Sequence, residues 1–437
     1  MRFTLVTLLP LAWAASVPSS KKIDYTGFKN VRITLPENDA QGAAAAIRKL
    51  ASTVLHPSHK DDLEIIVSPQ NLDAVKALAS ETTVVVDDVG AALAEEEVSK
   101  VYAVPSESWF TAYHSYNDHV QFLRDMQTSY PSQSEIVNLG TSVQGRPISS
   151  IHIWGSGGKG SKPAIVFHGT VHAREWISTM TTEYMVYQLL TKYSTDAAVK
   201  AIVDKFDFYI TPLVNPDGKD EPKPMSFVYK ACANQDVPGF AYTQTNDRFW
   251  RKNRQTVSGS TCVGRDINRN WPYNWGLTGG ASTNPCDETF KGRAAGDAPE
   301  LRAVKSQADS LSSGRGISFY VDFHSFGQYI LWPYGHDCSL VAPEEAALRA
   351  LATTTANGIR GVSGTAYTLG NSCRALYATT GTAPDYFLGA VKSKYAYTIE
   401  LRPPPGNSVN GFALPANQIQ PTVRETWAGV LAGLRGV

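Results

Sequence analysis

The segment at 168–176, with the sequence His-Gly-Thr-Val-His-Ala-Arg-Glu-Trp, places an imidazole and a carboxylate where they can act together. An apolar run at 163–167 predicts a buried strand before it, and apolar side chains at helical spacing over 176–190 predict a helix after it. His172 and Glu175 therefore lie where a strand turns into a helix, a crevice position that favours chemistry in α/β sheets. Three residues apart on a turn, the two side chains can converge on one zinc ion. A surface ion pair is the alternative for these two residues alone.

A catalytic zinc site needs three protein ligands and one open position for water. The run Phe-Tyr-Val-Asp-Phe at 319–323 predicts a second buried strand, and His324 follows at its carboxyl end. His172, Glu175 and His324 then form a two-histidine, one-carboxylate set that predicts a single bound Zn²⁺.

Glu400 is the candidate for the proton-transferring group that hydrolysis at a zinc site requires. It follows the apolar run at 395–399, so it lies on or just past a core strand, where a carboxylate without a function is uncommon. Such a group takes a proton from water and returns it to the leaving amine. A salt bridge between Glu400 and Arg402 is the structural alternative.

The chain resembles the zinc metallocarboxypeptidases of the pancreatic carboxypeptidase A/B type from about residue 106 to its end. The matching segments follow the family's order: His-Ala-Arg-Glu-Trp-Ile at 172–177, Asn-Pro-Asp-Gly at 215–218, Arg-Phe-Trp-Arg-Lys-Asn-Arg at 248–254, Asn-Arg-Asn-Trp at 268–271, His-Ser-Phe at 324–326, Tyr377, and Glu-Leu-Arg at 400–402. The resemblance implies an exopeptidase that acts on peptide or protein C-termini, with Glu400 as its general base.

The resemblance also implies roles for residues that would otherwise be assigned to the charged surface. Arg254 is matched to the arginine that polarises the carbonyl and holds the oxyanion. Asn268 and Arg269 resemble the clamp for the terminal carboxylate, which arginine binds through two parallel hydrogen bonds. Tyr377 resembles the mobile tyrosine that closes over that carboxylate. The other expected substrate-binding residues are Arg174, Ser325, Phe326 and Pro384.

Pro384 occupies the position that separates basic from neutral preference in the family. An acidic residue there would favour C-terminal Lys or Arg, which proline cannot do. Asp385 follows it, but members that prefer neutral residues also carry this aspartate. The neighbouring matched positions are uncharged: Leu331, Gly335, Ser372, Leu376, Thr379 and Thr398. We therefore expect a preference for C-terminal aromatic or aliphatic residues.

Composition and the N-terminus predict an exported globular protein. The 437 residues include 40 basic and 40 acidic ones, so no basic field favours nucleic acid or an anionic membrane. Residues 1–14 combine an arginine, a short apolar run and Ala-Trp-Ala, the pattern of a signal peptide. No later stretch approaches the length of a membrane-spanning segment. We expect a secreted monomer that binds neither nucleic acid nor membrane.

The five cysteines agree with export. The resemblance implies disulfides between Cys262 and Cys286 and between Cys338 and Cys373. Cys232 is then left without a partner. Five reduced structural cysteines are the alternative.

Residues 15–104 predict a separate small α+β domain, an open sandwich. Its strands and helices alternate, at 28–35, 40–55, 63–67, 69–78 and 82–86. It looks like the family's activation domain, which covers the active-site mouth of the zymogen until an activating protease cuts, here between about residues 100 and 112. Residues 105–437 then form the catalytic domain, with α/β architecture: a mixed, mostly parallel sheet with helices on both faces.

Two other functions fit a chain of this kind. A catalytically silent relative could act as a binding or wall-associated protein, but neither a ligand nor the base is lost. A zinc amidohydrolase or deacylase could share the fold, but it would lack the carboxylate clamp formed here by Asn268, Arg269 and Tyr377, together with Arg254.

Residues 219–239 interrupt a segment that matches the family on both sides. They contain Cys232 and show neither helical nor strand periodicity. One interpretation is a surface loop, which costs little loop-closure entropy. The other is a translated intron, because Gly218-Lys219 can be encoded with a donor-like string and 238–239 can supply an acceptor. Transcript sequencing across this segment decides between them, since codons retained in mature message would eliminate the intron.

Overall fold

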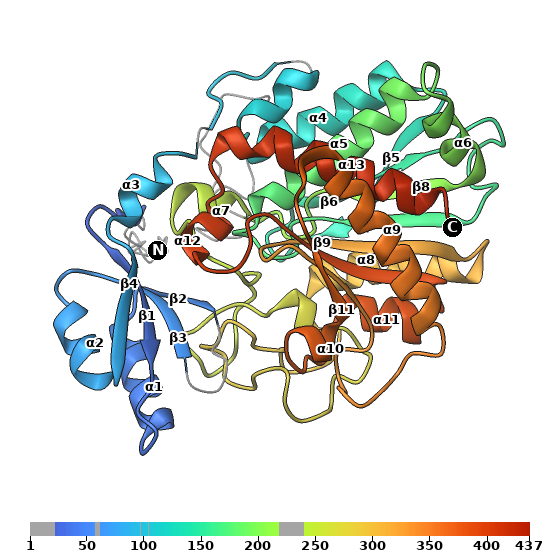
Figure 1. Cartoon of the computed structure of the whole chain (residues 1–437). Helices are drawn as coiled ribbons and strands as arrows, with labels where there is room; N and C mark the ends of the chain where they lie inside the picture. Colours follow the sequence, from blue (N-terminus) through green and yellow to red (C-terminus); the bar gives the residue numbers. More distant parts are fainter. Residues whose placement is uncertain (1–21, 57–61, 97, 104, 218–239) are drawn as a thin grey trace, which may run out of the picture.

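The computed structural model describes residues 22–56, 62–96, 98–103, 105–217 and 240–437. The chain forms a small N-terminal lobe and a large C-terminal lobe that lie side by side (Figure 1). The expected signal peptide at 1–14 and the segment 219–239 with Cys232 lie outside the described residues. Among the helices of the described part, none is long and apolar enough to cross a membrane.

The small lobe is built on a four-stranded antiparallel sheet in the order β2-β3-β1-β4. Its elements are β1 (Lys29–Thr34), α1 (Ala40–Leu50), β2 (Thr53–His56), β3 (Asp62–Val67), α2 (Leu72–Leu78), β4 (Glu81–Val86) and α3 (Val89–Leu93). The predicted helix over 40–55 is too long. The backbone N–H of Ser52 bonds to the Ile66 carbonyl, so the β-branched residues that follow join the sheet as β2. The predicted helix over 69–78 likewise begins only at Leu72.

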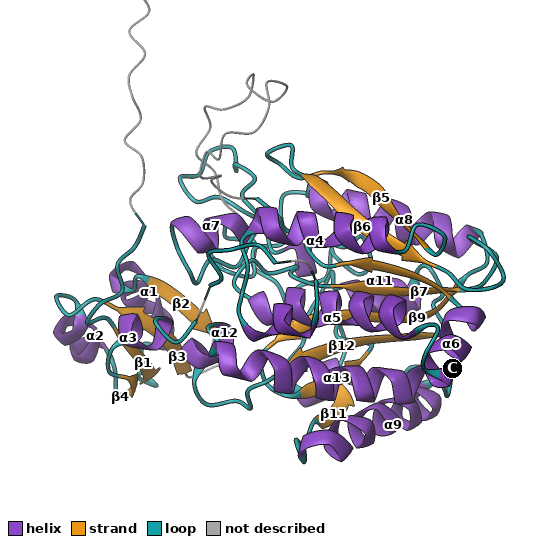
Figure 2. Ribbon diagram, turned by 90° about the horizontal axis from the view of Figure 1, so that it is seen from above, coloured by secondary structure: helices purple, strands orange, loops and turns teal. Residues whose placement is uncertain are grey.

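The large lobe surrounds an eight-stranded sheet in the order β11-β10-β12-β9-β7-β8-β6-β5. The strands are β5 (Ser134–Thr141), β6 (Pro147–Ile153), β7 (Ala164–His168), β8 (Asp207–Thr211), β9 (Ile317–Ser325), β10 (Tyr329–Trp332), β11 (Thr368–Asn371) and β12 (Tyr395–Leu401). The central run β12-β9-β7-β8 is parallel, and β5 and β6 are antiparallel at one edge. The predicted mixed sheet with helices on both faces is confirmed (Figure 2).

Helices cover this sheet on both sides. They are α4 (Tyr116–Ser129), α5 (Trp176–Lys192), α6 (Ala197–Lys205), α7 (Phe240–Thr245), α8 (Pro299–Ser313), α9 (Glu345–Ser363), α10 (Ser372–Ala375), α11 (Ala383–Gly389), α12 (Ser408–Phe412) and α13 (Ile419–Leu434), with 3₁₀ turns at Glu107–Thr111, Ile267–Arg269 and Ala416–Gln418. Alternate residues of β9 face different helices. Tyr320 stacks on Phe387 of α11, whereas Phe319 contacts Tyr397, whose hydroxyl bonds to α9. By this alternation, His324 lies on the α11 side.

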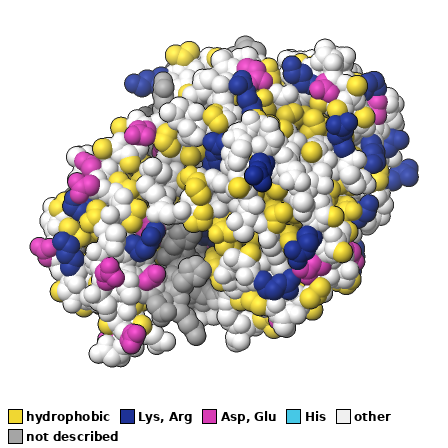
Figure 3. Space-filling view, in the orientation of Figure 1, with side chains coloured by type: hydrophobic (Ala, Val, Ile, Leu, Met, Phe, Trp, Pro, Cys, Tyr) yellow, Lys and Arg dark blue, Asp and Glu magenta, His cyan; other side chains and the backbone are white. Residues whose placement is uncertain are grey.

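The two lobes share a buried apolar cluster. The small lobe contributes Tyr25, Leu55, Ile66 and Val89, and the large lobe contributes Phe249, Phe326, Val409, Phe412 and Ala413. On the face in Figure 3, basic and acidic side chains are interspersed rather than gathered into one field.

A buried ion pair fastens the end of the small lobe to the large one. Glu96 accepts from Arg248 Nε at 2.6 Å and from Nη2 at 2.5 Å, and both side chains are 4% exposed. The neighbouring Asp247 accepts from the Tyr25 hydroxyl at 2.8 Å. Two consecutive residues of the large lobe therefore hold two separate parts of the small lobe.

We expect Glu96→Ala to loosen the small lobe, because it leaves the Arg248 guanidinium buried without its carboxylate. Breaking a buried pair in this way costs on the order of 3–5 kcal/mol. Limited proteolysis of the connection near residue 100 should become markedly faster. Lys29→Ala, which breaks the pair with the exposed Asp87, serves as the control and should change the rate little. Equal rates for the two variants would contradict the assignment.

Candidate active site

A tight turn after β7 positions the first two expected zinc ligands. Gly169 follows the strand, where a Cβ would come within 3.0 Å of Thr182, Ser178 and Pro212 atoms, so only glycine fits. Thr170 then adopts a left-handed backbone (φ 48°) and bonds Ser178 through its N–H, which closes the turn against α5. The turn leaves Glu175 at the residue before α5.

Strand register brings His324 and Glu400 to the same place. β9 and β12 are parallel neighbours in which His324 pairs with Glu400. Side chains at paired positions project from the same face of a sheet, so both residues point to one side, at the carboxyl ends of their strands. The alternative partner of Glu400 is excluded, because Arg402 donates from Nε to Glu425 at 2.7 Å and bonds Thr365 and Gln418.

His172, Glu175 and His324 form a compact, buried group. Glu175 Oε1 lies 2.8 Å from His172 Nδ1, Oε2 lies 2.9 Å from His324 Nδ1, and the two Nδ1 atoms are 3.1 Å apart. One ligand atom from each residue falls within 4.8 Å of the others, which suits a single metal ion. Two imidazole nitrogens and a carboxylate oxygen are zinc ligands, and the residues present therefore fit Zn²⁺.

Two aspartates that the sequence analysis missed support these histidines from behind. Asp266 Oδ1 is 3.0 Å from His172 Nε2, and Asp322 Oδ2 is 2.9 Å from His324 Nε2. The hydrogen bond to Asp266 keeps the proton of His172 on Nε2 and leaves its Nδ1 lone pair for a metal, whereas Asp322 approaches His324 at ion-pair distance. The sequence held a signal for Asp322, because residues two apart on a strand share a face.

Burial and neighbouring charges act on the carboxylates of the site. Burial opposes ionisation of Glu175, yet the adjacent His172 and His324 lower its pKa well below the usual range. Burial raises the pKa of Glu400 to about 8; the nearby His324 opposes this rise and Glu175 adds to it. Glu400 Oε2 is buried without a hydrogen-bond partner among the described residues, so it can accept or release a proton toward the group.

The structure brings Arg251, rather than Arg254, to this group. Arg251 Nη2 donates to Asp266 at 2.8 Å, and its Nη1 lies 3.8 Å from Glu175 Oε1. The Arg254 guanidinium instead stacks 3.9 Å from the Trp250 ring and also lies over Tyr242. The expected carbonyl-polarising role of Arg254 therefore does not fit its position. Both arginines belong to the same motif at 248–254, three residues apart, so sequence alone did not separate them.

The expected carboxylate clamp lies beside the group. Asn268 Nδ2 is 3.3 Å from His324 Nε2, and Asn268 Oδ1 accepts from the Ala383 N–H at the start of α11. Arg269 is buried and donates to the carbonyls of Asn268 and Gly280. Tyr377 is 38% exposed.

The expected pocket residues gather around α11. Pro384 is buried in its first turn. Asp385 accepts from the Gly335 N–H at 2.9 Å and from His336 Nδ1 at 2.9 Å. These bonds hold the Asp385 carboxylate against residues 335 and 336.

The remaining expected residues lie under the small lobe. Arg174, 1% exposed, donates to the carbonyl of Leu55 at 2.9 Å and packs 4.0 Å from the Phe412 ring. Ser325 donates its N–H to Glu175 Oε2 at 3.3 Å. Phe326 belongs to the apolar cluster shared by the lobes. The small lobe thus covers the loop that carries the metal ligands.

Both expected disulfides, Cys262–Cys286 and Cys338–Cys373, are present. The first ties the segment that carries Asp266, Asn268 and Arg269.

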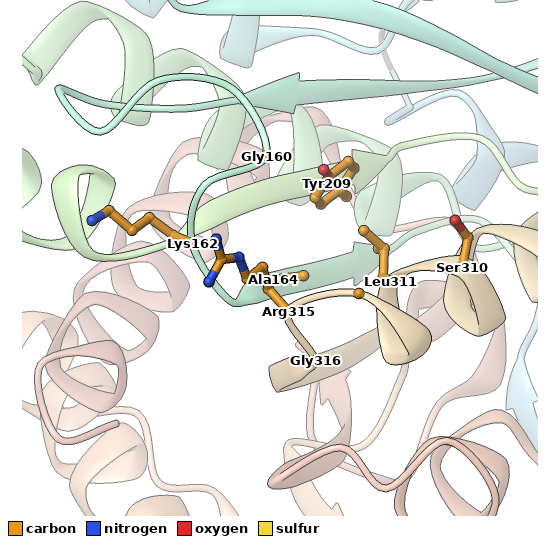
Figure 4. A pocket seen from close by; sticks show the side chains of 9 residues that line it. Gly160, Lys162, Ala164, Tyr209, Ser310, Leu311, Arg315 and Gly316 are labelled. Carbon is orange, nitrogen blue, oxygen red and sulfur yellow. The ribbon is translucent and has the colours of Figure 1, made fainter.

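A separate groove of about 470 Å³ lies at the opposite end of the sheet (Figure 4). Ala164 at the start of β7 and Gly316 just before β9 line it, together with Tyr209 and Arg315. The metal ligands lie beyond the carboxyl ends of the same strands. The groove is therefore not part of the candidate active site.

Comparisons with known proteins agree with this geometry. Residues 119–429 match the zinc carboxypeptidase family of peptidases. Metallocarboxypeptidase A of Trichophyton tonsurans is 38% identical over 444 residues, covering 100% of this chain and 99% of that protein. Zinc carboxypeptidase A 1 of Anopheles gambiae is 34% identical over 427 residues, covering 95% and 91%. The crystal structure of carboxypeptidase A from Helicoverpa armigera superposes with a TM-score of 0.75 at 25% identity, covering 94% and 97%.

The fold and the site define a zinc-dependent peptide hydrolase. The chain belongs to the zinc carboxypeptidase family, whose members act on the C-termini of peptides.

We expect Asp266→Asn to weaken zinc binding about 10- to 100-fold, because it removes the charge that orients His172. Zinc affinity is measured by competition with a chelator. Asp204→Asn, on the surface of α6, is the control and should leave the affinity unchanged. Wild-type affinity in Asp266→Asn would refute the supporting role.

Proposed function

We propose that this protein is a secreted zinc exopeptidase that removes single C-terminal residues, prefers neutral aromatic or aliphatic ones, and is made as a latent precursor. The observation that carries the proposal is the position of Glu400 opposite His324 in adjacent strands, beside the His-Glu-His group. Residues 1–14 and the two disulfides support export.

Each side chain of the site has a distinct part in the reaction. When bound by His172, Glu175 and His324, zinc supplies Lewis-acid polarisation of the carbonyl and lowers the pKa of a bound water to about 7. Glu400 accepts a proton from the attacking water and returns it to the leaving amine. Arg251 donates hydrogen bonds to the developing oxyanion.

The free carboxylate of the substrate determines which peptide bond lies at the reacting groups. Asn268 lies next to His324 and Arg269 donates to its carbonyl, so the two could hold the C-terminal carboxylate one residue beyond the scissile bond. Tyr377 closes over it. The uncharged surroundings of Pro384, with Asp385 already bonded, favour a neutral side chain in the adjoining pocket.

The small lobe is proposed to act as the inhibitor of its own enzyme. It contacts Arg174 and packs on Phe326, which flank Glu175 and His324 in the chain. A cut between about residues 100 and 112 by an activating protease would free it to leave. Glu96 lies before that region, so its buried pair with Arg248 would break when the small lobe departs.

Kinetics on N-blocked dipeptides test the proposal. The trimmed enzyme should cleave C-terminal Phe with a higher kcat/KM than C-terminal Arg, and the uncut precursor should be much less active.

Exhaustive chelation should abolish turnover. Glu400→Gln should lower turnover by several orders of magnitude while zinc stays bound. Full activity after chelation, or a preference for Arg, would refute the corresponding part.

The two arginines of the 248–254 motif make a matched pair of variants. Arg251→Ala should lower kcat/KM by about 10²–10³-fold, because it removes a donor to the oxyanion. Arg254→Ala removes an equal charge from a position stacked on Trp250 and should have a small effect. Zinc content is measured in both variants to separate catalysis from metal loss. A large loss confined to Arg254→Ala would restore the original assignment.

A further inference from the structure

A cavity of about 160 Å³ lies in the large lobe between α4, α5 and the β5–β6 edge of the sheet. Its lining includes His119, Val120, Leu123 and Arg124 of α4, Glu183 of α5, and Leu213. None of these residues belongs to the catalytic site described above. An apolar cavity of about 150 Å³ in another protein accommodates benzene, so the space suits a single aromatic ring.

The floor of the cavity is apolar and buried, and its mouth is polar. Leu123 and Leu213 are less than 10% exposed, whereas Arg124 and Asn138 at the rim are exposed. A ligand here would place an apolar body inside and a polar end at the surface. An aromatic ring with substituents at opposite ends has this shape.

One polar side chain on the floor has an unused hydrogen-bonding atom. His119 is 2% exposed, and its Nδ1 donates to Glu183 Oε1 at 2.8 Å. Glu183 is fully buried, and its Oε2 accepts from Trp109 Nε1 at 2.9 Å. Because the carboxylate accepts at both oxygens, the proton on His119 is fixed at Nδ1. Nε2 is then an acceptor, and it has no partner among the described residues.

We propose that this cavity binds a para-substituted phenol, with the ring between Leu123 and Leu213 and the hydroxyl donating to His119 Nε2. The Glu183–His119 pair presents a fixed acceptor at the end of an apolar slot, which a phenol satisfies and a plain hydrocarbon leaves unpaired. Two sources carry this group, a free small phenol and the tyrosine side chain of a polypeptide. The substituent opposite the hydroxyl lies at the mouth, beside Arg124.

Calorimetry on the full-length, zinc-loaded protein compares p-cresol with toluene, which differ only in the hydroxyl. We expect p-cresol to bind about tenfold more tightly or better, since toluene leaves the buried acceptor without a partner. His119→Asn keeps an amide donor toward Glu183, and its shorter side chain places no acceptor at the position of Nε2. In this variant the two affinities should become equal. Equal binding in the wild type, or no binding of p-cresol, would overturn the proposal.

A variant that fills the cavity tests whether p-cresol binds there. Val120→Trp introduces a large side chain at a partly exposed lining position, so it should block p-cresol while the fold is retained. This control matters because an aromatic ligand could also enter the specificity pocket near Pro384. Undiminished p-cresol binding in Val120→Trp would place the ligand elsewhere and overturn the assignment.

Binding of N-acetyltyrosinamide distinguishes the two sources of the phenol group, a free small phenol and a tyrosine side chain. This compound lacks a free carboxylate, so it is not a substrate of an exopeptidase. If its binding is also blocked by Val120→Trp, the cavity accepts a tyrosine side chain from a polypeptide. If only p-cresol binds there, the ligand is a free small phenol.

Discussion

The site depends on a concentration of buried carboxyl groups packed around two histidines. Glu175, Asp266 and Asp322 are each no more than 1% exposed, and Glu400 adds a fourth carboxyl group. Arg251 contacts two of them, Asp266 and Glu175. Burying charge is costly, so a cation that joins these carboxylates stabilises the group. A divalent ion bound by His172, Glu175 and His324 would add such a charge, so the electrostatics favour a metal here as well as the ligand set does.

The same constraint explains how the chain distributes its supporting residues. Each ligand histidine has a carboxylate near its far nitrogen, and Arg251 bridges Asp266 and Glu175, so these two carboxylates share a cationic partner. The disulfide between Cys262 and Cys286 ties the segment that carries Asp266 and the clamp residues. A loop without regular structure is thereby held firmly enough to orient a metal ligand, as the chemistry requires.

Sequence patterns predicted the elements whose own residues carry a clear signal, such as a continuous apolar run. The buried strands β7, β9 and β12 are continuous apolar runs, and the residues at their carboxyl ends were correctly expected to converge. The short strands β10 and β11 and the edge strand β5 were not predicted, because each depends on a partner strand rather than on its own pattern. The sequence analysis assigned the carbonyl-polarising role to Arg254 instead of Arg251 for a similar reason. A motif gives the presence of arginines, but only the turn around Trp250 decides which one faces inward.

The metal ligands are already assembled while the small lobe is in place. His172 and His324 both contact Glu175 at hydrogen-bond distance beneath the shared apolar cluster, so docking of the small lobe does not distort them. We infer that latency is a matter of access rather than of a deformed site. The small lobe contacts Arg174 and Phe326, two of the residues proposed to bind the substrate. On this proposal, removal of the lobe would uncover these residues without any rearrangement of the metal ligands.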